Sequence, residues 1–346
     1  MPAHALDAGP LVATAALEPA LGQALRRTLG AGRVTVVDRH PTPYRSSFAL
    51  EELTVRLDTG VCLSLMFKDL SPRALLDGAR DAKPDFLCDP RREIAVYRDL
   101  LAPHRLPAPR YYGSWVDEDR GRYWLFIERV AGVPLAEVGE LAVWQAAARE
   151  LASLHRRFAG TAAGAATAAP LIRYDAAYYA QWPERAVAFL RDAQPAPSDA
   201  ILRALQRLRE AYGRVVAELT ALPATLLHGE CYAANVLVQE TPEGRRMAFV
   251  DWEMAALGPG LVDLAALTAG RWTEPERATL AAAYAEALGD GAVAPPDRWA
   301  RAFECCRLHL ALQQLGWSRT WSAPPHHAHD WLSEALRLAE RVELLR

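Results

Sequence analysis

The chain has 346 residues, of which 51% are hydrophobic and 23% charged, and its formal net charge is −3. This composition is typical of a globular protein, and the length suits two lobes better than one compact core. The charge balance argues against nucleic-acid binding, which needs a clearly basic domain or stripe, and no apolar run approaches the length of a membrane span. We therefore expect neither a nucleic acid nor a membrane as partner, and no protein partner is evident.

The cysteines indicate a reducing compartment. Five are present, Cys62, Cys88, Cys231, Cys305 and Cys306, and none forms a C-x-x-C pair. An odd count with two adjacent members is a poor basis for a disulfide framework. The first 30 residues also lack the continuous apolar core of a signal peptide. These features predict a cytoplasmic protein.

The first part of the chain is predicted to form a leading helix followed by strands. The helix spans residues 11–29 and ends at the glycines that follow. Strands are expected at residues 34–37, 53–57 and 61–70, the last two joined by an Asp-Thr-Gly turn. Because side chains alternate along a strand, Lys68 lies on a face of residues 61–70 that is otherwise small and apolar. Taken alone, Lys68 would be interpreted as a strand-end lysine that reaches solvent.

The next helix changes this interpretation. Asp89 is a good N-cap and Pro90 suits the first helical position, so a helix is predicted over residues 91–101. Glu93 lies at the edge of the apolar stripe of this helix, where it could serve the helix dipole or reach inward to Lys68. A strand lysine held by a helix glutamate is the arrangement with which a kinase positions its phosphate-binding lysine.

Two more strands and a linker complete the first lobe. The strands are expected at residues 110–116 and 122–130, around an acidic turn that ends in glycine. Five strands and the helix at residues 91–101 form a small antiparallel α+β lobe. The Ala-Gly-Val-Pro stretch that follows marks a linker. We therefore expect two lobes, residues 1–130 and residues 131–346.

The remainder of the chain is predicted to be mainly helical. An Ala/Gly/Thr-rich segment at residues 160–170 is predicted to be a loose loop. A histidine-rich run at residues 326–330 is explained more simply as a solvated helix start than as a metal site. Helices are expected at residues 141–158, 175–192, 199–219, 260–270, 275–288, 297–317 and 329–345.

One predicted hairpin brings polar residues together. Residues 236–238 pair with residues 248–250 around a Pro-Glu-Gly turn. This pairing sets Asn235, before the first strand, beside Asp251, after the second. Amide and carboxylate oxygens suit a hard cation such as Mg²⁺. Glu230, upstream on the same loop, is free to act as a base, so the hairpin outlines a phosphoryl-transfer site.

The order of these features resembles the aminoglycoside phosphotransferase and choline kinase family, which has a protein-kinase-like fold. The resemblance covers residues 34–315 and is strongest in two motifs, His-Gly-Glu-x4-Asn at residues 228–235 and Val-Asp-Trp-Glu at residues 250–253. It implies an α+β, bilobal fold with a small antiparallel-sheet N-terminal lobe that binds nucleotide. The larger, mainly helical C-terminal lobe would carry the catalytic loop and the acceptor pocket.

The resemblance also implies roles for the motif residues. Glu230 stands where the family usually has an aspartate and would act as the base, at the same offset from Asn235 as in the kinase catalytic loop. Asn235 and Asp251 would hold the Mg²⁺ ions that bridge the phosphates of ATP, with GTP not excluded. His228 and Asp263 would have structural roles, His228 in the catalytic loop and Asp263 in the loop after the metal site.

The nucleotide-binding loop is the part that matches the family least. Residues 43–49, between the first two strands, contain no glycine, whereas a glycine-rich loop lets backbone amides approach phosphate closely. The hydroxyls of Ser46 and Ser47 could substitute, although an ordinary loop fits the sequence equally well. Backbone groups from Glu128 to Val130 would contact the purine.

The acceptor pocket implied by the resemblance belongs to the helical lobe. Aromatic faces there could pack a sugar or a quaternary amine, and acidic groups could pair with a cation. The same aromatic side chains could equally be helix–helix core. The candidates are Asp175, Tyr178, Glu304 and Trp317.

From these features we expect an ATP-dependent phosphotransferase that moves the γ-phosphate to a hydroxyl of a small molecule. The acceptor could be an aminoglycoside, another antibiotic, an amino alcohol or a sugar. Two alternatives stay open: a kinase of Ser or Thr on a natural-product precursor peptide, and a pseudokinase that binds nucleotide without transfer. The glycine-free loop and the exchange of aspartate for Glu230 are the features that support the pseudokinase.

Overall fold

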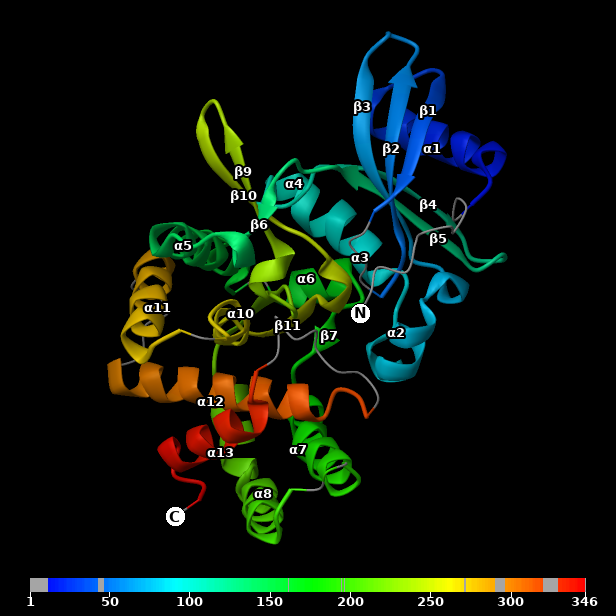
Figure 1. The fold of residues 1–346 in the computed structure, drawn as a ribbon. Coiled ribbons are helices and arrows are strands. Elements are labelled where there is room, and N and C mark those ends of the chain that lie inside the picture. Colours follow the sequence, from blue (N-terminus) through cyan, green and yellow to red (C-terminus); the bar gives the residue numbers. More distant parts are fainter. Residues whose placement is uncertain are drawn as a thin grey trace.

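The small lobe is built on a five-stranded antiparallel sheet (Figure 1). It belongs to a computed structural model that describes residues 12–42, 47–160, 162–193, 195, 197–270, 272–289, 296–319 and 329–345. The spatial order of the strands is β1-β2-β3-β5-β4, which confirms the five predicted strands. Their bounds are β1 (Val34–Pro41), β2 (Leu50–Leu57), β3 (Cys62–Asp69), β4 (Tyr111–Asp117) and β5 (Arg122–Glu128).

One face of this sheet is covered by α1 (Thr14–Leu29), which packs on β4 and β1. Leu17 of the helix is fully buried in the core that α1 shares with the strands. The helix comes so close to β4 that a Cβ on Gly113 would lie 2.7 Å from Ala24 Cβ. Gly113 also has a φ of 147°, so only glycine suits this position. The predicted leading helix is confirmed from Thr14 onward.

The other face of the sheet contacts a helical segment that differs from the prediction. The helix predicted over residues 91–101 is confirmed as a helical segment, but the chain widens within it into a π-helical turn. Pro103 gives the physical reason: it lacks a backbone N–H and clashes with the carbonyl four residues earlier. Glu93 still lies in the first turn. The pieces are α3 (Arg92–Ala95), the π-helical turn (Val96–Leu101) and α4 (Ala102–His104), and the short α2 (Asp77–Ala82) precedes them.

Helices make up most of the large lobe, which lies below the sheet in Figure 1. They are α5 (Leu141–Phe158), α6 (Ala162–Ala168), α7 (Ala176–Arg191), α8 (Asp199–Ala211), α9 (Gly213–Thr220), α10 (Leu261–Leu267), α11 (Glu274–Leu288), α12 (Pro296–Leu315) and α13 (Trp331–Arg341). Two three-stranded sheets accompany them, in the orders β10-β9-β6 and β7-β11-β8. Their strands are β6 (Val133–Pro134), β7 (Ile172–Arg173), β8 (Ala224–Leu227), β9 (Val236–Thr241), β10 (Gly244–Phe249) and β11 (Ala256–Pro259). The predicted α+β, bilobal fold is confirmed.

Two predictions for the large lobe are wrong in detail. Residues 160–170 were expected to be a loop, but most of them form α6, because alanine has the highest helix propensity. The single helix expected over residues 199–219 is divided at Tyr212 into α8 and α9. Gly213 follows that residue, and glycine is a poor helix former. The histidine-rich run lies outside the described residues, apart from His329 and the residue after it.

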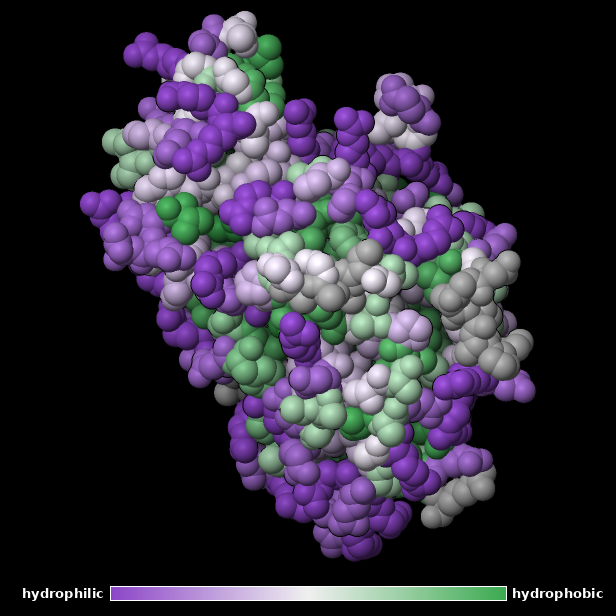
Figure 2. Space-filling model, turned by 180° about the vertical axis from the view of Figure 1, so that it is seen from behind, coloured by the Kyte–Doolittle hydropathy of each residue, from purple (hydrophilic) through white to green (hydrophobic). Residues whose placement is uncertain are grey.

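The hydrophobic core continues from the large lobe into the small one. Phe126 of β5 points to the α1 side of the sheet, whereas Leu125 and Ile127 point to the opposite side and belong to the core of the large lobe. The two lobes therefore share apolar packing through β5 and α3. Seen from behind, hydrophilic residues cover much of the surface and hydrophobic residues gather toward its middle (Figure 2). Within the described ranges, none of the helices has the length and apolar character needed to cross a membrane.

Candidate active site

The β9–β10 hairpin places Asn235 and Asp251 at its open end. Val236 pairs with Phe249 across a two-residue turn. The predicted pairing, which matched Val236 with Val250, is wrong by one residue, because the turn length sets the register. The Val250 backbone N–H instead donates to the Asn235 carbonyl at 2.9 Å. The residues that flank the two strands therefore still lie close together.

Lys68 joins two carboxylates at this end of the hairpin. Its Nζ lies 2.8 Å from Glu93 Oε2 and 2.5 Å from Asp251 Oδ1, and the residue is only 3% exposed. Burial acts to lower the pKa of Lys68, but the carboxylates outweigh it and raise the pKa above its usual value. Burial acts to raise the pKa of Asp251, but Lys68 outweighs it and brings the pKa below its usual value. Lysine and aspartate are therefore both charged, and the predicted contact between Lys68 and Glu93 is confirmed.

The loop that carries Glu230 is anchored at its start by Asp263. The Asp263 carboxylate, from the first turn of α10, accepts the backbone N–H groups of His228 at 2.6 Å and Gly229 at 2.9 Å. Gly229 has a φ of 85°, and a Cβ there would lie 2.0 Å from the Met254 carbonyl oxygen. Asp263 was expected to support the loop after the proposed metal site; in the structure it supports the start of the loop that carries Glu230.

His228 holds the same loop through both ring nitrogens. Its Nε2 lies 2.8 Å from the Val250 carbonyl oxygen, and its Nδ1 lies 3.3 Å from the Glu230 backbone nitrogen. Burial lowers the pKa of His228, which favours the neutral ring. A neutral ring protonated on Nε2 donates to the carbonyl and accepts from the backbone N–H. The contact to a nearby carbonyl agrees with the structural role predicted for this histidine.

Asn235 and Asp251 have the donor chemistry for a divalent cation. Asn235 Nδ2 donates to the Glu230 carbonyl at 3.0 Å, which leaves the side-chain oxygen of Asn235 as the available ligand atom. Asp251 adds an ionised carboxylate. Oxygen donors of this kind fit Mg²⁺, which is usually held by one or two carboxylates together with phosphates and water. No group of three or more His, Cys, Asp or Glu suited to a metal ion occurs among the described residues.

Glu230 lies among other acidic groups. Burial is the main cause that raises its pKa to about 8, and the charges of Glu253 and Asp251 act in the same direction. Lys83 and Lys68 oppose this shift. A carboxyl group whose pKa lies near neutrality is matched to general acid–base work.

A second lysine, which sequence reasoning did not select, lies beside these carboxylates. Lys83 follows α2, is 8% exposed, and its Nζ lies 3.3 Å from Glu253 Oε1. The same oxygen accepts the hydroxyl of Ser47 at 2.5 Å. Arg92 donates to the Glu253 backbone carbonyl at 2.8 Å. One signal for Lys83 was present in the sequence: the chain has 39 Lys and Arg residues, of which only Lys68 and Lys83 are lysines.

The predicted nucleotide contacts are only partly brought together. Ser47 faces Glu253, whereas Ser46 lies outside the described residues. The Glu128 backbone N–H already donates to the Arg110 carbonyl at 2.8 Å. The Glu128 side chain is paired with Arg246 of β10, at 2.6 and 2.7 Å. The Glu128 backbone N–H is therefore already occupied within the protein and does not face a purine.

The acceptor candidates on α7 and beyond α12 lie in an aromatic cluster. Tyr178 is 5% exposed and stacks on Tyr174, with ring centroids 4.0 Å apart. Trp317 stacks on Trp182 at 6.0 Å. The Asp175 carboxylate accepts the Tyr178 backbone N–H at 2.9 Å and thereby caps α7, so a structural role explains this residue.

Two further residues join α12 to the loop that carries Glu230. Gln314, near the end of α12, donates to the Tyr232 hydroxyl at 2.5 Å. Tyr232 follows Glu230 by two residues. Burial is the main cause that raises the pKa of Tyr232 and of Tyr174, and the charge of Glu230 acts in the same direction on both. The sequence prediction omitted Gln314 and Tyr232, because only tertiary packing brings α12 to the loop.

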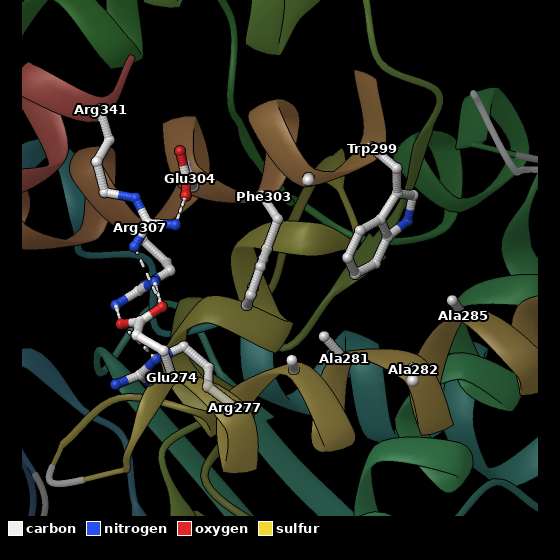
Figure 3. Close-up of a pocket in the computed structure, with 12 residues that line it drawn as sticks. Glu274, Arg277, Ala281, Ala282, Ala285, Trp299, Phe303, Glu304, Arg307 and Arg341 are labelled. Atoms are coloured by element: carbon white, nitrogen blue, oxygen red, sulfur yellow. Dashed lines mark hydrogen bonds and ion pairs between the residues drawn. The ribbon is translucent and has the colours of Figure 1, made fainter. Parts of the chain in front are cut away.

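Glu304 lies elsewhere. Its carboxylate forms an ion pair with Arg341 of α13, at the edge of a pocket of about 410 Å³ between α11, α12 and α13 (Figure 3). Trp299 and Phe303 face alanines of α11 across this pocket (Figure 3). Its described lining includes none of Lys68, Glu230, Asn235 and Asp251. The structure therefore does not bring Glu304 together with the other predicted site residues.

The arginine cluster beside this pocket is expected to stabilise the fold. Glu274 lies 3.3 Å from Arg307 and 3.2 Å from Arg341. Burial acts to raise the pKa of Glu274, but these arginines outweigh it and lower the pKa to about 2. We expect Glu274→Gln to lower the free energy of unfolding by about 1 kcal/mol at neutral pH, a modest value because half of the side chain is exposed. Denaturant titration measures this difference.

The pH dependence provides the control for that prediction. Because the folded-state pKa of Glu274 is depressed, its stabilisation is complete above the unfolded value near 4.5 and is lost as the pH falls toward 2. Glu286→Gln, on the exposed side of the same helix, should change little. Equal losses in the two variants would contradict the role assigned to the cluster.

These features are those of a kinase-like phosphotransferase, since a buried strand lysine contacts both a helix glutamate and a carboxylate at a hairpin end. The model of the phosphotransferase enzyme family matches residues 79–303, about two thirds of the chain. The chain belongs to this family, an enzyme class whose acceptor is an alcohol group.

Solved structures of similar fold agree with this assignment. The GDP complex of wild-type aminoglycoside 2'-phosphotransferase-IIIa has a TM-score of 0.56 at 14% identity, covering 94% of this chain and 98% of that one. A microcompartment-associated aminopropanol kinase has a TM-score of 0.55 at 16% identity, covering 89% and 94%. Choline kinase LicA from Streptococcus pneumoniae has a TM-score of 0.53 at 12% identity, covering 95% and 99%. At these identities the likeness shows the fold. Comparison with curated protein sequences gives no match.

Proposed function

We propose that this protein transfers the γ-phosphate of ATP to a hydroxyl group of a small molecule. The observation that carries the proposal is the position of Lys68, which is buried between Glu93 and Asp251 with the Glu230 loop adjoining. Lys68 is charged and is held in a fixed position by the two carboxylates. It is therefore well placed to bind the negatively charged phosphates of a nucleotide. Two neighbours of similar fold are named as kinases of amino alcohols and one as an aminoglycoside phosphotransferase, which supports small acceptors.

Each residue of the site has a defined part in the transfer. Lys68 binds a nucleotide phosphate and is positioned by Glu93. Asn235 and Asp251 would hold Mg²⁺, which supplies neutralisation of the phosphate charge. Glu230 accepts the proton of the acceptor hydroxyl as the acceptor oxygen forms its bond to the γ-phosphorus. The bond from that phosphorus to the ADP oxygen breaks, and ADP leaves.

The glutamate in place of the family's usual aspartate affects where the acceptor sits. Its side chain is one methylene longer, so the base reaches farther from the loop. The aromatic cluster that includes Tyr174 and Tyr178, together with Tyr232 two residues after Glu230, would pack the body of the acceptor. Aminoglycosides, other antibiotics, amino alcohols and sugars all present a hydroxyl that this geometry can accommodate.

The proposal is tested with an acceptor panel. The purified protein is incubated with Mg²⁺ and either ATP or GTP, and each acceptor is examined by mass spectrometry for the gain of one phosphate. ADP release is followed in parallel. We expect a small hydroxyl compound to gain phosphate, with ATP as the better donor. Transfer to Ser or Thr of a peptide library alone would instead indicate a peptide kinase. Nucleotide binding without transfer to any acceptor would indicate a pseudokinase.

A further inference from the structure

The two lysines of this chain converge on one place. Arginine supplies every other basic side chain among the 39 Lys and Arg residues. Lys68 comes from β3, and Lys83 comes directly after α2. This helix lies below the sheet and beside the large lobe (Figure 1). Both are buried, at 3% and 8% exposure, and both contact carboxylates of the Val-Asp-Trp-Glu motif. A buried lysine is rare unless it is paired or functional.

Lys83 is held less firmly than Lys68. Lys68 has two carboxylate partners within 2.8 Å, whereas the Glu253 carboxylate that pairs with Lys83 lies 3.3 Å away. The oxygen that Lys83 contacts is shared with the Ser47 hydroxyl, and Glu253 Oε2 is buried without a hydrogen-bond partner among the described residues. The Lys83 ammonium can therefore exchange Glu253 for another anion. A lysine is a single charge on a flexible side chain and does not form the fixed bidentate pair of an arginine.

Lys83 faces the catalytic carboxylates as well. Burial raises the pKa of Glu230 and acts in the same direction on Asp251, and the charge of Lys83 opposes both effects. Glu230 marks the acceptor side of the site and Asp251 the metal side. The Glu253 carboxylate that holds Lys83 at 3.3 Å comes two residues after Asp251, so this lysine lies beside the proposed metal side of the site.

The negative charge around the two lysines also favours a second cationic side chain beside the phosphates. Four carboxylates, those of Glu93, Glu230, Asp251 and Glu253, lie around the two lysines. A nucleoside triphosphate adds further negative charge. In addition, the loop between β1 and β2 has no glycine with which backbone amides could surround a terminal phosphate.

We infer that Lys83 binds the γ-phosphate of the nucleotide and replaces the charge neutralisation that a glycine-rich loop would provide. This inference rests on the proposed function. In the absence of nucleotide, Glu253 holds the lysine close to that position, and Ser47 donates to the same Glu253 oxygen. On binding, Lys83 exchanges the Glu253 carboxylate for a phosphate oxygen, while Lys68 remains with Glu93.

The alternative is that Lys83 only ties the α2 segment to the large lobe. Arg92 already does this, since its guanidinium donates to the carbonyls of Leu87, Pro170 and Glu253. A structural tie would affect binding of ATP and ADP equally, because both need the same folded site. A γ-phosphate contact affects ATP alone.

Isothermal titration of the full chain with MgATP and with MgADP separates the two explanations. We expect Lys83→Gln to weaken ATP binding about tenfold and ADP binding less than about twofold, since a charge-assisted hydrogen bond to phosphate is lost. Lys83→Arg keeps the charge and should recover part of the ATP affinity. Arg73→Gln removes the same charge from an exposed position on the same segment and should leave both affinities unchanged.

Several results would overturn the inference. Equal loss of ATP and ADP affinity in Lys83→Gln, accompanied by a lower unfolding temperature, would assign the lysine a structural role. Unchanged affinity for both nucleotides would also reject it, while the proposed function would stand. If the wild-type protein binds neither nucleotide, the inference and the proposed function both fail.

Discussion

Asp251→Asn is expected to lower the rate of phosphate transfer by about 1,000-fold, the largest loss of any single change in the site. The amide keeps the shape of the side chain but removes the negative charge that a divalent cation needs. Asparagine is preferred to alanine because Asp251 has a φ of 67°, and asparagine tolerates this left-handed conformation. Steady-state kinetics with the best acceptor of the panel and a titration of Mg²⁺ measure the effect.

The stability of this variant distinguishes lost chemistry from lost folding. After the change, Lys68 keeps its ion pair with Glu93, so the buried lysine is not left without a carboxylate partner. We therefore expect Asp251→Asn to stay folded, with an unfolding temperature moderately below that of the wild type, because the lowered pKa of Asp251 means that its charge stabilises the native state at neutral pH. Asp119→Asn, in the exposed turn between β4 and β5, is the matched control and should be fully active. Activity within tenfold of wild type would remove Asp251 from the metal site.

Glu230→Gln is the second change with a large expected effect. Glutamine has the same size but cannot accept a proton, so we expect the turnover number to fall between about 100-fold and 10,000-fold while nucleotide affinity changes little. Initial rates at saturating ATP and acceptor, together with nucleotide titrations, test both parts. Glu243→Gln, in the exposed turn of the same hairpin, is the control. A Glu230→Gln enzyme with nearly full turnover would show that transfer needs no base at this position.

The pH dependence of the wild type should carry the signature of Glu230. Burial raises its pKa to about 8 in the protein without nucleotide, and only the deprotonated form is a base. The value of kcat/KM for the nucleotide reports the free enzyme, so it should rise with pH and level off above about 8. A value of kcat/KM that stays constant from about pH 6 to about pH 9 would contradict the assignment of Glu230 as the base.

The same shift has a consequence for stability. A carboxyl group whose folded-state pKa is raised binds its proton more tightly in the native state than in the unfolded one. The native state therefore loses stability as the pH rises from about 4.5 to about 8. Glu230→Gln escapes this loss, and its unfolding temperature should exceed that of the wild type most clearly above pH 8. Measurements below the unfolded pKa should show no such gain.

The Lys68–Glu93 pair could be predicted from the sequence, because strand alternation and helix spacing each give the direction of one side chain. The hairpin could be predicted for the same reason, although its register depended on turn geometry. Both predictions use local rules: the alternation of side chains along a strand, the spacing along a helix and the pairing of two neighbouring strands.

Residues that meet only through tertiary packing could not be placed in this way. Glu304 lies on α12, which has buried residues on several sides, so its sequence does not reveal which side faces the catalytic loop. Gln314 contacts that loop from the same helix, whereas Glu304 contacts α13. Lys83 follows a short helix in a segment without clear periodicity, and only the rarity of lysine set it apart.

The linker between the lobes is itself a strand of the catalytic hairpin's sheet. Val133 of β6 pairs with Val238 of β9, and a Cβ on Gly132 would lie 2.8 Å from the Val238 carbonyl oxygen. The Glu128–Arg246 pair fastens the last strand of the small lobe to β10. A tilt of the small lobe therefore pulls on the two strands that end at Asn235 and Asp251. Any such tilt would act close to the open end of the hairpin, because Val238 lies only two residues after Val236, where β9 begins beside Asn235.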